Sequence, residues 1–82
     1  MAEKYVILSP LSGVFYSRFS PEEDPCVEIG GRVEKGMIVC IVETMKVFND
    51  VRSEKSGIVR EILVEDEDSV TINQPLMIVE PD

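Results

Sequence analysis

The hydrophobic residues of the chain fall in short runs, and polar or turn-forming residues separate these runs at close intervals. Short runs rich in Val and Ile, bounded by turn residues, are typical of β-strands. No longer stretch has the periodicity of an amphipathic helix. The pattern therefore predicts an all-β domain with strands at Tyr5–Leu8, Gly13–Tyr16, Cys26–Ile29, Met37–Val42, Val47–Ser53, Gly57–Val64 and Leu76–Val79.

Two of these strands should differ in burial. Side chains of the Val47–Ser53 segment alternate in direction, so that one face meets the core and the other meets solvent. The Met37–Val42 segment is apolar throughout, which predicts a strand covered on both faces. Cys40 lies within it, and we expect a small buried hydrophobic residue there.

An internal repeat organises the chain. The pattern S-x-x-S-G at Ser9–Gly13 returns at Ser53–Gly57, an offset of 44 residues. Val33–Glu43 matches Val70–Glu80 at an offset of 37 residues. The common order of the two matches indicates a duplicated half-domain. Two similar β-halves that face each other predict a small sandwich or flattened barrel.

The repeat also locates turns and an insertion. Gly36 falls opposite Asn73, and both residue types tolerate the positive φ of a tight turn. Because the offset falls from 44 to 37 residues, the first half carries seven additional residues. The prolines and charges of residues 17–25 predict a protruding loop there. We interpret the acidic run Glu65–Asp68 as a solvated turn, with an electrostatic docking patch as the alternative.

Composition narrows the possible functions. The 82 residues suffice for one small domain, and 16 acidic against 8 basic residues give a net charge of −8. This charge argues against nucleic acid and anionic membranes as partners. The chain has no histidine and two cysteines. Two cysteines without histidine are too few for a conventional zinc site, and the usual general base is missing. We therefore expect neither a metal nor catalysis by this chain alone.

No segment has the composition of a membrane span or of a signal peptide. We therefore expect the chain in the cytoplasm, or in an organelle stroma or matrix if it is cut from a targeted precursor.

The junction between the two halves holds the candidate site. Glu43 ends the first half, and Glu43–Val47 would form the hairpin turn that leads into the second half. By the pseudo-twofold relation this turn lies opposite the end that holds both termini, so Lys46 should project from an exposed tip. Tight hairpins favour Asn-Gly or Asp-Gly, yet Met45 and Lys46 occupy this one. On residue types alone, a solvated surface lysine and a functional lysine both remain possible.

The residues around Lys46 resemble a known family. Glu43–Asn49 is similar to the biotin-attachment hairpin of biotin carboxyl carrier proteins, whose usual core is Glu-Ala-Met-Lys. The insertion at residues 17–25 resembles the thumb of the carrier protein of bacterial-type acetyl-CoA carboxylase. The likeness extends over nearly the whole chain through four further segments: Ser9-Pro10, Gly13–Tyr16, Lys55–Val59 and Ile62–Glu65.

The resemblance implies the barrel-sandwich hybrid fold of biotinyl and lipoyl domains, in which two pseudo-twofold-related four-stranded halves form a flattened β-barrel or sandwich. Residues 1–82 would form a single biotinyl domain, with a thumb insertion at residues 17–25 and a biotin-attachment hairpin at residues 43–47.

The resemblance also implies a function. Biotin would be attached covalently to Lys46, and Arg18 stands where a threonine of the family commonly contacts the biotin ring. The chain would be a non-catalytic carrier that takes CO₂ from a biotin carboxylase to a carboxyltransferase of an acetyl-CoA or acyl-CoA carboxylase in fatty acid synthesis. A biotin protein ligase would load it. The residues implied in recognition of the attachment motif are Glu43, Thr44, Met45 and Val47.

Two alternatives remain open. Thr44 favours a lipoyl-type carrier, because the usual pattern of lipoyl domains around the modified lysine is Glu-Thr-Asp-Lys. Met45 and the insertion argue against it. An unmodified biotinyl-like interaction protein is disfavoured by the presence of Lys46, since loss of the lysine is the simplest route to such a protein.

Overall fold

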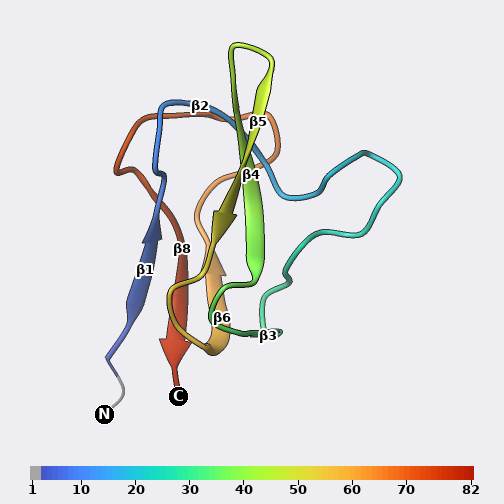
Figure 1. Cartoon of the computed structure of the whole chain (residues 1–82). Helices are drawn as coiled ribbons and strands as arrows, with labels where there is room; N and C mark the ends of the chain where they lie inside the picture. The colour runs from blue at the N-terminus through green and yellow to red at the C-terminus, as the bar shows by residue number, and fades with distance from the viewer. Residues whose placement is uncertain (1–2) are drawn as a thin grey trace.

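The computed structural model describes residues 3–82 and holds eight strands in two four-stranded antiparallel sheets (Figure 1). One sheet has the strand order β1-β8-β6-β3, and the other has the order β5-β4-β2-β7. The all-β fold with two packed sheets is therefore confirmed. The strands are β1 (Tyr5–Leu8), β2 (Gly13–Tyr16), β3 (Arg32–Val33), β4 (Ile38–Thr44), β5 (Val47–Arg52), β6 (Gly57–Ile62), β7 (Ser69–Val70) and β8 (Pro75–Pro81).

The strand order shows the internal repeat directly. If each strand of β1–β4 is exchanged with its counterpart in β5–β8, the order β1-β8-β6-β3 becomes β5-β4-β2-β7. One sheet is thus the image of the other. Each half contributes two strands to each sheet, so the halves interleave and neither can bury its apolar face without the other.

Equivalent hydrogen bonds fix the same turn in both halves. The Asn73 N–H donates to the Ser9 carbonyl at 2.7 Å, and the Gly36 N–H donates to the Ser53 carbonyl at 2.7 Å. Gly36 has a φ of 88° and Asn73 a φ of 69°, which confirms the positive φ expected at these positions. Both serines are buried, and each hydroxyl donates to a backbone carbonyl two residues ahead.

The core lies between the inner faces of the two sheets. Strand β4 is buried on both faces over four residues: Val39, Cys40, Ile41 and Val42 are each at most 2% exposed. The prediction that the Met37–Val42 segment is covered on both faces is therefore confirmed for Val39–Val42, whereas Ile38 is half-buried and Met37, just before the strand, is 37% exposed. The buried residues that form the core cluster are Ile7, Phe15, Val27, Val33, Val39, Cys40, Val42, Val51, Val59, Val70, Leu76, Met77 and Val79.

The predicted strand at Cys26–Ile29 is wrong. This segment is an irregular connection, although Val27 is buried and Cys26 packs against the core. Ile29, by contrast, is 65% exposed, so the apolar residues here do not share one face. The chain enters this segment after Pro25, which cannot donate a ladder hydrogen bond. The short strand β3 begins only at Arg32.

Two strands were not predicted, and several ends differ. β3 and β7 have two residues each, which is too short for an apolar run to stand out. β4 and β8 continue beyond the predicted ends, through Thr44 and Pro81, because their backbones stay paired after the apolar residues stop. β6 ends earlier than predicted, at Ile62.

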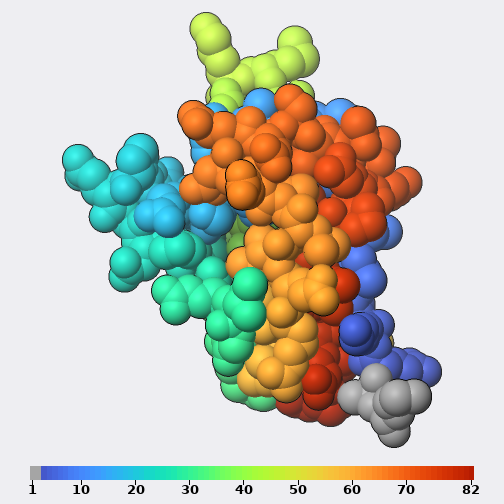
Figure 2. Space-filling model, turned by 180° about the vertical axis from the view of Figure 1, so that it is seen from behind, coloured from blue at the N-terminus to red at the C-terminus, as the bar shows by residue number. Residues whose placement is uncertain are grey.

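Residues 17–25 form an arm that leaves the body of the molecule between β2 and β3 (Figure 1). In the space-filling view the arm stands out at one side, and the tip of the β4–β5 hairpin rises above the body (Figure 2). Residues 3–82 include no helix long and apolar enough to cross a membrane. Within the same residues, no group of three or more Cys, Asp or Glu side chains is arranged to hold a metal ion.

Candidate functional site

Met45 and Lys46 form the two-residue turn of the β4–β5 hairpin. Thr44 pairs with Val47 on either side of the turn. Both central residues have positive φ, 51° at Met45 and 64° at Lys46. This combination requires a type I′ turn, which Asn-Gly fills without strain. An L-residue with a long side chain pays about 1–2 kcal/mol in this region, so the turn keeps a methionine and a lysine against local preference.

The tip is exposed on every side. Met45 is 93% exposed, Val47 is 56% exposed, and Lys46 is likewise exposed. The hairpin lies at the end of the molecule opposite the C-terminus (Figure 1). No ion pair within residues 3–82 involves the Lys46 ammonium. The Lys46 side chain is therefore open to solvent.

The base of the hairpin is more firmly held than the tip. Glu43 and Thr44 end β4 in half-buried positions. The side-chain amide of Asn49 donates to the carbonyls of Val42 and Val47, each at 3.2 Å. The bond to Val42 connects β5 to β4 just below the tip, and the bond to Val47 stays within β5. Lys46 is thus presented on a defined support although its own side chain is solvated.

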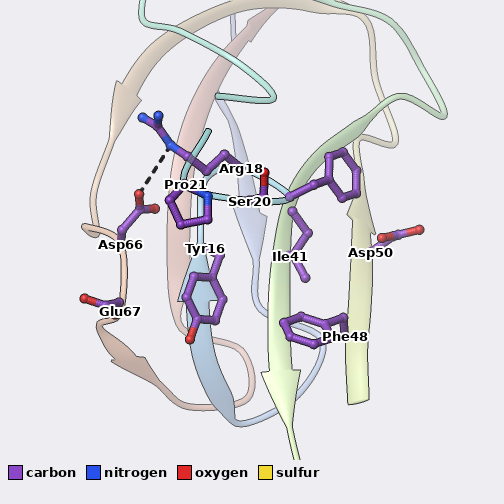
Figure 3. Close-up of a pocket in the computed structure, with 10 residues that line it drawn as sticks. Tyr16, Arg18, Ser20, Pro21, Ile41, Phe48, Asp50, Asp66 and Glu67 are labelled. Carbon is purple, nitrogen blue, oxygen red and sulfur yellow. Dashed lines mark ion pairs between the residues drawn. The ribbon is translucent and has the colours of Figure 1, made fainter. Parts of the chain in front are cut away.

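A cavity of about 570 Å³ lies between the arm and the outer face of the β5-β4-β2-β7 sheet (Figure 3). Its floor is apolar, and carboxylates stand around its rim. Tyr16 and Phe48 lie at the end of the cavity toward which β4 runs, and Arg18 lies at the other end (Figure 3). The lining residues are Tyr16, Arg18, Phe19, Ser20, Pro21, Ile41, Phe48, Asp50, Asp66 and Glu67.

The strand register explains the floor of this cavity. Tyr16, Ile41 and Asp50 form one row across β2, β4 and β5, on the face turned away from the core. Ile41 is only 2% exposed although it is outside the core cluster, because the arm covers it. The rings of Tyr16 and Phe48 lie beside it, with their centroids 6.3 Å apart and their planes tilted by 51°.

Arg18 and Asp66 meet at the base of the arm. The Arg18 Nε lies 3.7 Å from Asp66 Oδ2, and the Ser17 N–H donates to Asp66 Oδ1 at 2.6 Å. Burial raises the pKa of Asp66, but the hydrogen bond from Ser17 and the charge of Arg18 outweigh it, so its pKa falls below the ordinary value. The carboxylate is therefore charged at neutral pH.

The cavity rim is acidic toward the hairpin. Burial raises the pKa of the Tyr16 hydroxyl, and the charge and hydrogen bond of Glu43 and the charges of Glu67 and Asp66 raise it further. Tyr16 is therefore a neutral hydrogen-bond donor at neutral pH.

The structure separates the residues singled out in the sequence into two places. Glu43, Thr44, Met45, Lys46 and Val47 stand together at the hairpin, and Arg18 lies in the cavity beside it.

Sequence reasoning missed Tyr16, Ile41, Phe48 and Asp66 as members of one site. The available signal was weak: Phe48 is an aromatic residue on the polar side of a half-buried strand. Asp66 belongs to the acidic run Glu65–Asp68, whose composition predicts a solvated turn, and no local pattern indicates its contacts with the arm.

Sequence and fold are both similar to those of known proteins. The family described as "Biotin-requiring enzyme" matches residues 6–79. The chain is 45% identical over 73 residues to the chloroplastic biotin carboxyl carrier protein of acetyl-CoA carboxylase 2 from Arabidopsis thaliana, covering 89% of this chain and 29% of that protein. It is 40% identical over 76 residues to the biotin carboxyl carrier protein of acetyl-CoA carboxylase from Haemophilus influenzae, covering 93% and 49%.

A similar match, 45% identity over 76 residues, is found with the biotin carboxyl carrier protein of acetyl-CoA carboxylase from Nostoc sp., covering 93% of this chain and 42% of that protein. The chain thus spans less than half the length of each of these relatives. Part of the crystal structure of Kluyveromyces lactis urea carboxylase superimposes with a TM-score of 0.80 and 28% identity, covering 96% of this chain and 6% of that one.

Proposed function

Since the chain belongs to the family of biotin-requiring enzymes, we propose that Lys46 carries covalent biotin and that the domain is a biotin carboxyl carrier. The observation that carries this proposal is the turn itself. Two non-glycine residues accept a left-handed backbone at the outermost point of the molecule, where they contribute nothing to the core. Because this backbone strain is not offset by packing in the core, we infer that Met45 and Lys46 are retained for an interaction with another molecule.

The residues at the tip fit the attachment chemistry. A lysine amine attacks only when deprotonated, and Lys46 is exposed where a modifying enzyme can reach it. A biotin protein ligase would supply biotinyl adenylate. The Lys46 Nζ would then form an amide bond with the biotin carbonyl carbon, the carbonyl–phosphate bond would break, AMP would leave, and the ligase would accept the amine proton. Glu43, Thr44, Met45 and Val47 surround the amine and would be recognised with it.

The domain itself would present and transport the group. Bound biotin supplies a ureido ring that can accept and deliver CO₂. The partners would be a biotin carboxylase and a carboxyltransferase of an acetyl-CoA or acyl-CoA carboxylase, in the cytoplasm or an organelle stroma. Attachment to a carrier keeps the reactive group at high effective concentration near both active sites. The chain would hold no catalytic residue.

The cavity beside the hairpin fits the ring. Phe48 and Asp50 lie two and four residues after Lys46, which is about 7 and 14 Å along an extended strand. The lysine side chain and the biotin chain together supply about ten single bonds of roughly 1.5 Å each, so the ring can reach this region. We assign Tyr16 and Phe48 to the surface on which the ring would rest, with the apolar stem of Arg18 at the far end of the same cavity. The arm would then act as the thumb of the domain.

Intact mass tests the attachment. The chain should gain one biotinyl group when it is co-expressed with a biotin protein ligase and supplied with biotin. Lys46→Arg should abolish the gain, and Lys35→Arg, at another exposed lysine, should leave it unchanged. An unmodified wild-type chain would overturn the proposal. The same assay with a lipoyl ligase would then test the lipoyl-type carrier, which Thr44 favours.

A further inference from the structure

The arm covers an apolar residue on the solvent side of a sheet, and few polar contacts hold it there. Its two ends are joined by the Cys26 N–H, which donates to the Ser17 carbonyl at 2.8 Å. This hydrogen bond closes the loop but does not set its tilt over Ile41. The contacts that connect the arm to the opposite wall of the cavity are those of Ser17 and Arg18 with Asp66.

Asp66 is itself fixed to the sheet beneath the arm. The Glu67 N–H donates to the Phe15 carbonyl at 2.7 Å, and the Phe15 N–H donates to the Asp68 carbonyl at 2.9 Å. Asp68 Oδ2 accepts the Glu65 N–H at 2.9 Å and closes the turn around Asp66. Because Phe15 is a buried core residue of β2, Asp66 is a rigid attachment point.

Arg18 extends this connection into the arm. Its Nη1 donates to the Glu23 carbonyl at 3.1 Å, while its Nε faces Asp66. Glu23 belongs to the outer turn of the arm, where its N–H donates to the Ser20 carbonyl at 3.1 Å. One guanidinium therefore joins the fixed Asp66 to the outer turn. The close-up shows the Arg18 side chain directed at Asp66 and away from Phe48 (Figure 3).

We propose that Asp66 and Arg18 are positioning residues that hold the arm over the outer face of the β5-β4-β2-β7 sheet and thereby set the shape of the cavity. Without them the arm would remain closed at Ser17 and Cys26 but would tilt away from Ile41. For the loaded domain, the consequence rests on the proposed function: the arm would determine how long the group on Lys46 stays against the cavity floor.

The unloaded chain tests the positioning role independently of biotin. Phe19 is the aromatic residue of the arm and lines the same cavity as Ile41, so the proton chemical shifts of the Ile41 methyl groups report whether the arm is closed. Asp66→Ala and Arg18→Gln should move these shifts toward the values of an exposed isoleucine. Asp66→Asn retains an acceptor for Ser17 and should cause a smaller change. Asp24→Asn removes the same charge from an exposed arm residue and should leave the shifts unchanged.

The Asn49 and Lys46 amide signals serve as the folding control, since the hairpin does not depend on the arm. The proposal would be overturned if the Ile41 methyl shifts stayed the same in both Asp66→Ala and Arg18→Gln, or if Asp24→Asn moved them as much. If Asp66→Ala does not fold, Asp66→Asn and Arg18→Gln decide the question.

The second measurement uses the biotinylated chain. The biotin ring signals of the wild type should differ from those of a biotinylated hairpin peptide, and Asp66→Ala should reduce that difference by half or more. Identical biotin ring signals in the wild type and Asp66→Ala would refute the consequence for the carried group. They would not affect the result of the methyl experiment on the arm. A chain that accepts no biotin would instead refute the proposed function, and the methyl experiment on the unloaded chain would stand unaffected.

Discussion

Ile41 and Ile78 occupy equivalent positions in the two halves, yet Ile41 is buried to 2% exposure whereas Ile78 remains partly exposed. Both side chains stand on the outer faces of their sheets, in rows set by the same antiparallel register. The first half carries the arm and the second half does not. The arm therefore creates a second, smaller buried region outside the main core, and the candidate cavity lies there.

We expect Ile41→Ala to lower the free energy of unfolding by about 2–4 kcal/mol, because it removes a fully buried side chain. Ile78→Ala should cost about half as much or less, because its side chain is already partly in water. Chemical denaturation of the two variants measures the difference. Equal losses would mean that the arm does not exclude solvent from Ile41.

Replacing Met45-Lys46 by Asn-Gly should stabilise the domain by about 1 kcal/mol or more, since these residues accept a type I′ turn without left-handed strain. The same change removes the amine and should abolish biotin loading. Denaturation and intact mass together test both effects. No gain in stability would show that the observed turn is not strained, and the argument from strain to function would fail.

Gly57→Ala should lower the free energy of unfolding far more than an ordinary glycine substitution does. An added Cβ would lie 2.2 Å from the Glu80 carbonyl oxygen, a backbone atom that cannot move aside. We expect a loss of about 3 kcal/mol or more. Gly30→Ala is the matched control: its space is open, so only the strain of a φ of 88°, about 1–2 kcal/mol, remains. The thermal midpoints of the two variants should therefore separate clearly.

The architecture could be predicted from the sequence because the chain contains the same half-domain pattern twice. The repeat of Ser9–Gly13 at Ser53–Gly57, together with the alternation of apolar residues, determined the two related halves and placed Lys46 at their junction. A two-residue strand such as β3 is too short to produce a recognisable pattern of apolar residues. The Cys26–Ile29 segment has residues typical of a strand but pairs with no strand.

The cavity was beyond sequence reasoning for a different reason. Tyr16, Ile41 and Asp66 are separated by about 25 residues at each step, and only the sheet register and the tilt of the arm bring them together. No local rule indicates that a carboxylate in an acidic run accepts the Ser17 N–H. The contacts that position the arm thus become visible only in three dimensions.

Acid should weaken the hold of Asp66 on the arm. Its pKa is lower in the folded chain than in the unfolded chain, so the stabilisation is complete above the unfolded pKa and is lost as the pH falls through the folded one. The groups that face Asp66 are Arg18 and Tyr16, with Glu67 and Asp50 on the same cavity. The raised pKa of Tyr16 keeps its hydroxyl neutral across this range.

The measurement is the pH dependence of the free energy of unfolding in wild type and Asp66→Asn. Arg32 lowers the pKa of Glu34 and Asp82 in the same direction, so the wild type alone will lose stability in acid from more than one source. The difference between the two curves isolates Asp66. That difference should shrink as the pH falls, and a constant gap would contradict the assignment.

Met45 offers a test that separates recognition from stability. Its side chain is 93% exposed, so Met45→Leu should change the free energy of unfolding by less than about 0.5 kcal/mol. Both residues are apolar and of similar size, but methionine is unbranched and adapts to differently shaped surfaces, whereas leucine is branched and stiffer. If several partners must bind this tip, the substitution should slow biotin loading and CO₂ transfer at unchanged stability. Initial loading rates, measured at equal ligase concentration beside the control Ile29→Leu at an exposed apolar residue away from the hairpin, decide the point. Full loading and full transfer rates in Met45→Leu would show that any apolar residue serves before the lysine.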